Sequence, residues 1–510
     1  MTRLRILTAL SGLLVLPLAG EIQLQVIGTH STGIFNGSAA EVGAFDPATK
    51  RFFSVNGAAD TIVILDLTNP AVPTSFGTIG SLGGNPNSVA VCNGVVAVAV
   101  ENPVITTPGT VKFFDTSGAP LSSVTVGALP DMVIFTPNCR RLLVANEGEP
   151  SGGGDPEGSV SIIDMTVGAA NLTNANVATA SFAPFNGVAL DPSIRVFTPG
   201  ATVAQDLEPE FIAVSHDSRT AWVTLQENNA LATVDIETAT VTALAGLGFK
   251  DHSLAGNGLD VSDQDSANNI ATWPVFGIFQ PDSIAAYHHG RDTFLVMGNE
   301  GDARGFEETR VGAATYVLDP AAFPTAATLK MAGNLGRLTV STANGDTDGD
   351  GDFDQIFSFG ARSFSIRTVS GALVFDSGDQ LEQITAAAFP TRFNANSTSN
   401  SRDNRSDDKG PEPEGVAIGK AFGRTYAFIG LERIGGVMVY NITDPFAPTF
   451  VQYINNRNFS QTPAAGQGGD LGPEGLVFVR AEDSPNQNPL LIVSNEISGT
   501  TTVYEISKTP

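Results

Sequence analysis

Positive charge, histidine and the common catalytic motifs are scarce in this chain of 510 residues. Lys and Arg total 27 against 53 Asp and Glu, which gives a formal net charge of −26. A surface of this sign repels phosphate backbones and attracts cations, so we expect no nucleic-acid partner. The five histidines form no HExxH or comparable metal-binding spacing, and GxSxG, Walker-type and GxGxxG motifs are absent. These absences argue against serine hydrolases and nucleotide-binding enzymes.

Long apolar segments are confined to the N-terminus. Residues 1–20 contain two arginines, an apolar stretch from Ile6 to Leu18 and then small residues, a pattern typical of a secretory signal peptide. Nothing later in the chain is long and apolar enough to cross a bilayer. We therefore predict a secreted or periplasmic protein that has no membrane span and is a monomer.

Cysteine is nearly absent as well. Cys92 and Cys139 are the two cysteines of the chain, and both lie near predicted strand turns in different segments. They could pair in an oxidising compartment, but sequence does not show contact between them. We expect two free thiols.

An acidic or amide residue before a short apolar strand recurs seven times. The positions are Glu41, Asn87, Asp131, Glu210, Asp282, Glu414 and Glu474. A turn and a second strand follow each, and in six repeats this strand ends in a glutamate: Glu101, Glu147, Glu227, Glu300, Glu432 and Glu496. A third strand and often a fourth come next. Four short antiparallel strands repeated in series predict the blades of an all-β propeller.

Repeat spacing predicts eight four-stranded blades, with seven as the alternative. The distance from Asp282 to Glu414 is about double the shorter repeat distances, and the stretch QIFSFGARSFSIRTVSGALVFDSG between them alternates like strands. We interpret it as a degenerate blade. The last repeat has only three strands, so EIQLQVIG near residue 21 is predicted to complete it and close the ring. The predicted propeller domain covers residues 21–510, with long insertions near 165–206, 249–280 and 391–410.

The acidic residues that precede the first strands and the glutamates that end the second strands form two acidic sets, and both are predicted to lie on one face of the propeller. The start of the first strand and the end of the second lie at the same edge of a hairpin, beside the central channel. Unit charges about 4 Å apart repel by on the order of 4 kcal/mol, so a ring of carboxylates must protonate, spread out or bind cations. Alternatively, each carboxylate accepts backbone N–H groups in a local turn. The metal ligands predicted at this mouth are Asp131, Glu210, Asp282, Glu414, Glu474 and Glu496.

The stretch NGDTDGDGDFDQ has the spacing of a calcium loop. Asp346, Asp348 and Asp350 alternate, and Asp352 and Asp354 take the seventh and ninth positions after a glycine at the sixth. Such alternating oxygens wrap one ion, although the closing glutamate at the twelfth position is replaced by phenylalanine. A solvated turn is the alternative. Oxygen-only ligands select Ca²⁺, or else Mg²⁺, over zinc or copper.

Four positively charged residues are expected on or near the acidic face. Arg304, Arg362 and Arg433 each follow a predicted strand end, and Lys409 precedes PEPEG. They either neutralise the acidic ring as salt-bridge partners or hold an anionic substrate group beside the metals.

Several longer motifs are distinctive, among them VANEGEP, NEGDAR, GDTDGDGDFDQIFSFGARSFSI, RSDDKGPEPEGVAIG and GLERIGGVMVYNITDP. Together they resemble the choice-of-anchor I family over nearly the whole chain after residue 20. That family includes proteins labelled bacterial alkaline phosphatases and mesenchyme-specific cell-surface glycoproteins associated with calcium biominerals. The resemblance implies an exported calcium-binding propeller.

Three functions are compatible with these features. A calcium-dependent phosphomonoesterase would use metal ions at the mouth, with Glu147, Glu227, Glu300 or Glu432 orienting a water and Arg304, Arg362 or Arg433 holding the phosphate. A non-catalytic surface or matrix protein would use the same carboxylates to hold calcium while docking mineral, glycan or protein. In the third interpretation the metals only stabilise loops.

Overall fold

The computed structural model describes residues 20–509, which fold into an all-β architecture. All but the last residue of the predicted signal peptide lies outside the described residues. Among the described residues, no helix combines the length and apolar character needed to cross a membrane.

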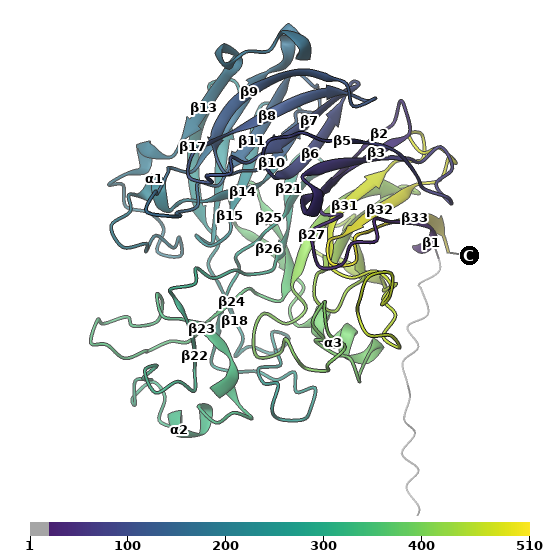
Figure 1. Ribbon diagram of the computed structural model, residues 1–510. Helices are drawn as coiled ribbons and strands as arrows, with labels where there is room; N and C mark the ends of the chain where they lie inside the picture. The colour runs from purple at the N-terminus through teal and green to yellow at the C-terminus, as the bar shows by residue number, and fades with distance from the viewer. Residues whose placement is uncertain (1–19, 510) are drawn as a thin grey trace, which may run out of the picture.

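Seven four-stranded antiparallel sheets form the blades, which we number one to seven in chain order (Figure 1). Blades one to three are β2 (Gly43–Asp46), β3 (Arg51–Asn56), β4 (Thr61–Asp66) and β5 (Thr74–Ile79); β6 (Pro86–Cys92), β7 (Val95–Val100), β8 (Pro108–Asp115) and β9 (Pro120–Ala128); and β10 (Pro130–Phe135), β11 (Arg141–Asn146), β12 (Ser159–Asp164) and β13 (Val177–Ser181). Blades four to six are β14 (Pro209–Val214), β15 (Thr220–Leu225), β16 (Ala230–Asp235) and β17 (Thr240–Gly246); β20 (Ile284–His289), β21 (Asp292–Asn299), β25 (Ser363–Thr368) and β26 (Leu373–Asp376); and β27 (Pro413–Ala421), β28 (Arg424–Leu431), β29 (Val437–Asn441) and β30 (Thr449–Ile454). Blade seven is β31 (Pro473–Val479), β32 (Leu490–Asn495), β33 (Thr500–Lys508) and β1 (Ile22–Ser31).

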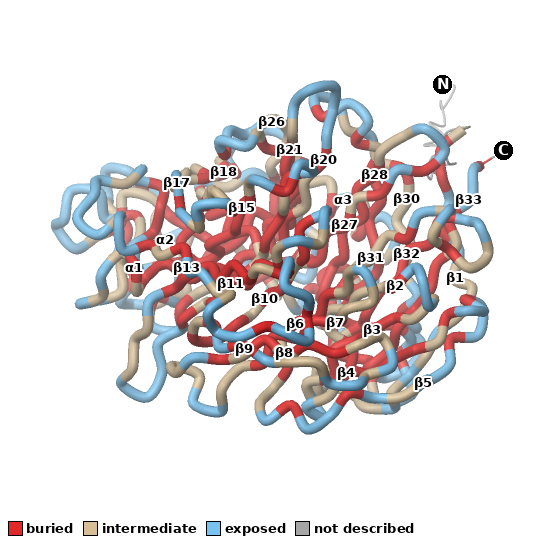
Figure 2. Tube along the Cα trace, turned by 90° about the horizontal axis from the view of Figure 1, so that it is seen from above, coloured by how far each residue is buried: buried red, intermediate tan, exposed pale blue. Residues whose placement is uncertain are grey.

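The first strand of each blade is innermost, and these strands surround a central channel. Each of β2, β6, β10, β14, β20, β27 and β31 contacts the innermost strand of the next blade, and β31 contacts β2. Seven hydrophobic clusters fill the seven interfaces between neighbouring blades. In β3, Phe52 packs against blade seven and Phe53 against blade two, because successive side chains of a strand point to opposite faces. The strands are therefore mostly buried, and exposure is concentrated in the connecting loops (Figure 2).

The predicted closure by the N-terminal strand is confirmed. β1 pairs antiparallel with β33 as the outermost strand of blade seven, so this blade combines both ends of the described chain. Glu21, just before β1, accepts hydrogen bonds from the Tyr426 hydroxyl at 2.9 Å and the Asn441 amide at 3.1 Å. Because both partners belong to blade six, the closing strand is also anchored to its neighbour.

An eighth sheet, of five strands, is built from insertions. It consists of β18 (Phe249–Asp251), β19 (Phe276–Ile278), β24 (Phe357–Phe359), β23 (Thr339–Ser341) and β22 (Glu308–Arg310), and it contains a parallel pair, β19 and β24. The stretch interpreted as a degenerate blade instead gives β24 to this sheet and β25 and β26 to blade five. Residues 300–362 are inserted inside blade five, which explains the doubled repeat distance. The propeller is confirmed, but its ring contains seven blades, the alternative count, and the eighth sheet is not one of them.

The remaining insertions form turns and short helices. The segment 165–206 includes the outer strand of blade three, and the segment 391–410 is held by Arg457, which donates to the carbonyls of Asn396 at 2.8 Å and Ser399 at 2.9 Å. The helices are α1 (Val203–Asp206), α2 (Ala326–Leu329) and α3 (Gln380–Ala388). Short 3₁₀ turns occupy Gly57–Ala59, Met165–Val167, Ala169–Asn171, Asn174–Asn176, Ala183–Phe185 and Leu335–Arg337.

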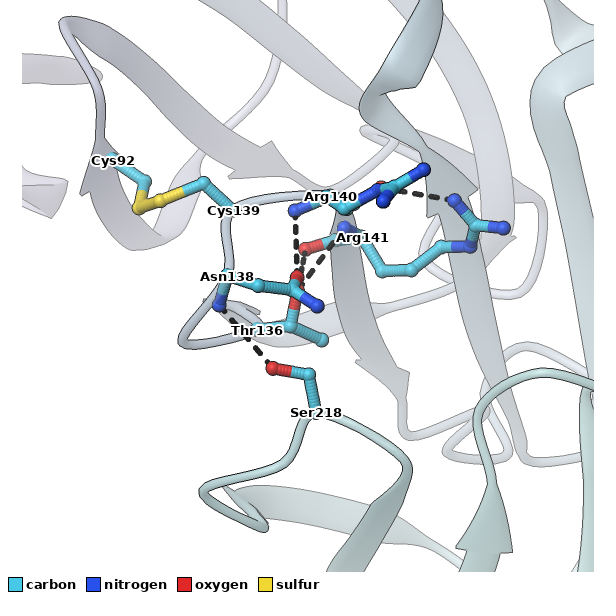
Figure 3. Close-up of a disulfide and its surroundings, with 7 residues drawn as sticks. All are labelled: Cys92, Thr136, Asn138, Cys139, Arg140, Arg141 and Ser218. Carbon is cyan, nitrogen blue, oxygen red and sulfur yellow. Dashed lines mark hydrogen bonds between the residues drawn. A yellow bond between two sulfur atoms is a disulfide. The ribbon is translucent and has the colours of Figure 1, made fainter.

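Cys92 and Cys139 form a disulfide, so the expectation of two free thiols is wrong. Cys92 ends β6 of blade two, and Cys139 lies in the turn between β10 and β11 of blade three (Figure 3). The same turn reaches blade four, because the backbone N–H of Asn138 donates to Ser218 Oγ at 3.2 Å. The cysteines are 47 residues apart in sequence. They meet only because neighbouring blades pack face to face.

Candidate cation site at the channel mouth

A β-bulge at the start of the innermost strand positions the acidic residue in four blades. The ladder register shifts immediately after Pro130, Pro209, Pro413 and Pro473, and each shift leaves the next two residues unpaired. Proline donates no ladder hydrogen bond, and a bulge re-aims the side chains within it. The acidic residues released in this way are Asp131, Glu210, Glu414 and Glu474. A proline followed by Asp or Glu is therefore the local sequence signal of this site.

Glycine next to the acidic residue allows neighbouring innermost strands to approach closely. A Cβ atom on Gly415 would lie 1.8 Å from the carbonyl oxygen of Glu474. On Gly475 it would lie 2.5 Å from the carbonyl oxygen of Glu41. Larger residues are excluded at both positions, and the carboxylates of adjacent blades are thereby brought together.

The acidic residues that end the second strands are held at the same edge. The backbone N–H of Glu147 donates to the Leu129 carbonyl at 2.9 Å, and that of Glu432 to the Glu412 carbonyl at 2.9 Å. Each acceptor directly precedes the proline of the innermost strand. The end of the second strand is thus tied to the start of the first.

Eight carboxylates and two positively charged side chains line a cavity of about 340 Å³ at the mouth. These residues are Asp131, Glu147, Glu210, Asp282, Glu300, Asp302, Glu414, Glu432, Lys409 and Arg433, together with Gln226. A second cavity of about 190 Å³ shares Asp131, Asp282 and Glu414 and adds Glu474 and Asn87. The expectation that both acidic sets meet at one mouth is confirmed for these residues. Asp302 and Gln226 were missed, although each lies within two residues of a predicted glutamate.

Two predicted residues adjoin the mouth without lining either cavity. Glu227 is 8% exposed, and its carboxyl lies beside that of Glu210. Glu496 accepts a hydrogen bond from Ser38 Oγ at 2.9 Å. Burial first, and then the charges of Glu41 and Glu496, raise the pKa of Glu474. Glu496 is therefore partly satisfied by a hydroxyl group, as the turn-capping alternative expects.

Burial and mutual repulsion disfavour ionisation of the mouth carboxyls. Burial, followed by the charge of Glu101, raises the pKa of Asp131 to about 6. Burial first and neighbouring carboxylates next raise the pKa of Glu210, Asp282, Glu414 and Glu474 well above the ordinary range. For Glu147 and Glu432 burial is again the main cause of a raised pKa. At neutral pH this group of carboxyls must bind protons or cations.

Four carboxylate oxygens near the mouth are buried and accept no hydrogen bond. They are the Oε2 atoms of Glu210, Glu227, Glu414 and Glu474. Buried polar groups in folded proteins are nearly always hydrogen-bonded, so each exception requires an explanation. Oxygens gathered from three blades and left without donors are suited to binding a cation.

On one side of the mouth, Lys409 and Arg433 form ion pairs with the carboxylates. Lys409 Nζ lies 2.8 Å from Glu300 Oε1 and 3.2 Å from Glu412 Oε2, and Arg433 pairs with Glu412 at 2.9 Å and Glu432 at 2.8 Å. Ligand oxygens of Glu300, Glu412 and Glu432 lie within 4.8 Å of one another. Burial raises the pKa of Glu412, but the neighbouring Lys and Arg groups outweigh it and lower that pKa to about 2. These three glutamates are therefore balanced by side chains, unlike the carboxylates across the mouth.

Arg304 and Arg362 do not line the mouth cavity, and their predicted role in substrate binding is not supported. Arg304 donates to Glu208 at 2.7 Å and to Asp206 at 2.5 Å. Arg362 donates to Glu382 at 2.8 Å and to backbone carbonyls of the insertions. Both side chains are buried, and both are paired with carboxylates that the sequence analysis did not predict for the site. Arg433 alone of the three arginines lines the cavity.

The predicted calcium loop is divided into two acidic groups. Ligand oxygens of Asp346, Asp348 and Asp350 lie within 4.8 Å of one another in an exposed group. Asp352 and Asp354 instead group with Asp319. The five aspartates therefore do not converge on one point, because the chain turns between the third and the fourth. No sequence signal marks Asp319, which lies outside the repeat.

Comparison with known proteins gives a family match and two similar curated proteins. Residues 41–445 match the family model of the choice-of-anchor I domain. Gigasin-3a of Magallana gigas is 30% identical over 184 residues, which cover 34% of this chain and 64% of gigasin-3a. The mesenchyme-specific cell surface glycoprotein of Strongylocentrotus purpuratus is 28% identical over 296 residues, which cover 51% of this chain and 37% of the glycoprotein. The chain spans less than two thirds of the length of either relative.

A solved structure supports the fold. The WD40 domain of coronin from Toxoplasma gondii superposes with a TM-score of 0.50 at 10% identity, covering 97% of this chain and 87% of that domain. At this identity the likeness concerns the propeller alone.

Proposed function

The chain belongs to the choice-of-anchor I family, and we propose that this member is an exported propeller whose channel mouth binds divalent cations. The observation that carries the proposal is the set of four buried, unpartnered carboxylate oxygens on Glu210, Glu227, Glu414 and Glu474. A buried carboxylate without a partner costs several kcal/mol, and bound cations would remove that cost.

The ligand chemistry favours Ca²⁺, with Mg²⁺ as the alternative. All candidate ligands are carboxylate or amide oxygens, which suit hard divalent cations rather than zinc or copper. Ca²⁺ accepts six to eight oxygens in flexible geometry, whereas Mg²⁺ requires a near-ideal octahedron. Carboxylates that converge from separate blades fit the more tolerant ion.

Calcium titration of the purified protein tests the mouth site. We expect Glu210→Gln with Glu414→Gln to weaken calcium binding at least tenfold by isothermal titration calorimetry. Both the reference protein and the mouth variant carry Asp346→Asn and Asp348→Asn, so that calcium binding to the exposed aspartate loop does not contribute to the measured heat. Glu237→Gln, on an exposed turn, is the matched control. Unchanged calcium binding in the double mouth variant would exclude the mouth as the site.

The proposed location is outside the cytoplasm, secreted or periplasmic. One relative is named a cell surface glycoprotein, and the Cys92–Cys139 disulfide is typical of oxidising compartments. A calcium site also suits an extracellular setting, where calcium is abundant.

Phosphomonoester hydrolysis is a second candidate, favoured by the presence of Arg433 and Lys409 in the same cavity as the carboxylates. When bound, divalent ions supply charge for phosphate oxygens and lower the pKa of a water. Glu147, Glu300 and Glu432 line the cavity and could orient that water, and Arg433 is placed to contact the phosphate.

Hydrolysis of p-nitrophenyl phosphate separates the catalytic from the non-catalytic form of the proposal. An esterase should require calcium, lose turnover in Glu432→Gln and keep it in Glu237→Gln. Absence of turnover on a panel of phosphoesters would reject the esterase without affecting calcium binding. The protein would then be a calcium-binding surface or matrix protein, for which calcium-dependent retention on mineral or glycan beads is the assay.

A further inference from the structure

A buried pair of carboxyl groups joins two insertions away from the channel mouth. Asp260 belongs to the insertion 249–280 and Asp403 to the segment 391–410. Their exposed fractions are 0% and 2%, and their carboxyl groups are neighbours. Asp260 also accepts the backbone N–H of Ser262 on Oδ1 at 3.3 Å and that of Asn269 on Oδ2 at 2.6 Å. Two carboxyl groups in contact inside a protein need a shared proton or a cation between them.

No positively charged side chain forms an ion pair with either aspartate in the part of the chain that the structure describes. Arg402 contributes positive charge and Asp265 negative charge nearby. The adjacent Glu382 is already paired with Arg362 at 2.8 Å. Burial, followed by the charges of Glu382 and Asp403, raises the pKa of Asp260 to about 8.

Two further oxygens at this place have no hydrogen-bond partner. Asp403 accepts the Ser406 hydroxyl on Oδ1 at 2.6 Å, but its Oδ2 is buried and unpartnered. Asn394 is fully buried and donates its amide to Ser406 Oγ at 2.9 Å and to Glu382 Oε1 at 2.8 Å, which leaves Asn394 Oδ1 without a donor. Ser406 thus links the Asn394 amide to the Asp403 carboxylate.

We propose that a divalent cation of the Ca²⁺ class binds between Asp260, Asp403 and Asn394 and ties the segment 391–410 to the insertion 249–280. The ligands are two carboxylates and one amide oxygen, and water completes the coordination. The cation replaces the shared proton and satisfies both unpartnered oxygens. It also explains how a polar segment rich in Asn, Ser and Asp holds a defined course over the propeller. This site is independent of the mouth site, with which it shares no residue.

The test is calcium titration of the full chain combined with limited proteolysis. In a background of Glu210→Gln and Glu414→Gln, which weakens the mouth, we expect calcium to protect the segment 391–410 from cleavage. Adding Asp403→Asn or Asp260→Asn should abolish that protection and remove one equivalent of bound calcium. Asp265→Asn, which alters a neighbouring charge outside the proposed ligand set, should leave both properties intact.

The two explanations of the buried pair give opposite results. With a shared proton, Asp403→Asn mimics the protonated pair, so the variant keeps its calcium equivalents and is as stable as the wild type in saturating calcium. That result overturns the proposal. Absence of calcium protection in the mouth-weakened background also overturns it, and this second measurement needs no change at Asp260 or Asp403.

Discussion

Replacing Glu227 by glutamine should stabilise the metal-free protein at alkaline pH. Burial first and the charge of Asp302 next raise the pKa of Glu227 from 4.5 to about 7. Because the pKa of Glu227 is higher in the folded than in the unfolded protein, protonation of this side chain favours folding. This stabilisation is fully present below pH 4.5 and is lost as the pH rises through 7. At about 1.4 kcal/mol per pH unit, the loss amounts to about 3 kcal/mol at pH 8. Glutamine has the same shape and carries no charge, so it avoids this loss.

Urea unfolding in EDTA measures this difference, with the fluorescence of Trp222 and Trp273 as the signal. We expect Glu227→Gln to exceed the wild type in free energy of unfolding by about 3 kcal/mol at pH 8 and by less than about 1 kcal/mol at pH 5. In saturating calcium the order should reverse, because the variant lacks one ligand. The exposed Glu237→Gln variant should match the wild type throughout.

Two results would refute this reasoning. Equal stability of the variant and the wild type at pH 8 in EDTA would show that Glu227 is already neutralised by protein groups. Greater stability of the variant without any loss of calcium affinity would show that the carboxylate is strained but binds no cation.

Three further predictions concern the scaffold. Reduction of the Cys92–Cys139 disulfide should lower the free energy of unfolding by about 4 kcal/mol, because the bond closes a loop of 47 residues and restricts the unfolded chain. Urea unfolding with and without reductant measures this loss, and a loss below about 1 kcal/mol would contradict the prediction. In the same assay Glu412→Gln should lower the free energy of unfolding by about 3–5 kcal/mol, because Lys409, Arg405 and Arg433 lose the carboxylate that they share. A variant within about 1 kcal/mol of the wild type would show that this ion-pair network is not needed for stability. Deletion of residues 21–31 should expose the edge of β33 and produce oligomers in size-exclusion chromatography, whereas a stable monomer would show that ring closure does not require β1.

Much of the fold follows from local pattern. Short strands separated by turns and repeated in series predict propeller blades, and the unpaired last repeat predicts closure by the N-terminal strand. The blade count did not follow, because an insertion between the second and third strands of blade five has the length of a blade and contains strands of its own. Spacing alone does not distinguish a degenerate blade from a blade interrupted by 63 residues, here 300–362.

The acidic mouth was predictable and its charge balance was not. Proline followed by Asp or Glu places a carboxylate in a bulge beside the channel in four blades, so convergence follows from the repeat. Arg304 and Arg362 also follow strand ends, but their partners Asp206 and Glu382 come from segments between blades that carry no repeat pattern. Asp319 joins Asp352 and Asp354 for the same reason, through a contact distant in sequence. The second partner of Arg304, Glu208, directly precedes Pro209 just as Glu412 precedes Pro413.

The amino-acid order by itself determined the strands, their serial arrangement and the face on which the carboxylates stand, because these depend on period-two alternation and on turns a few residues long. Only the tertiary structure decided which carboxylates keep a positive partner and which are left without one. Burial and pairing of a charge depend on side chains that reach it from other blades and insertions, and the energy of a buried charge is set by those neighbours. For that reason Glu412 is held ionised by three positive groups, while Glu210 and Glu414, in the same ring, are left with buried oxygens that nothing in the described chain satisfies.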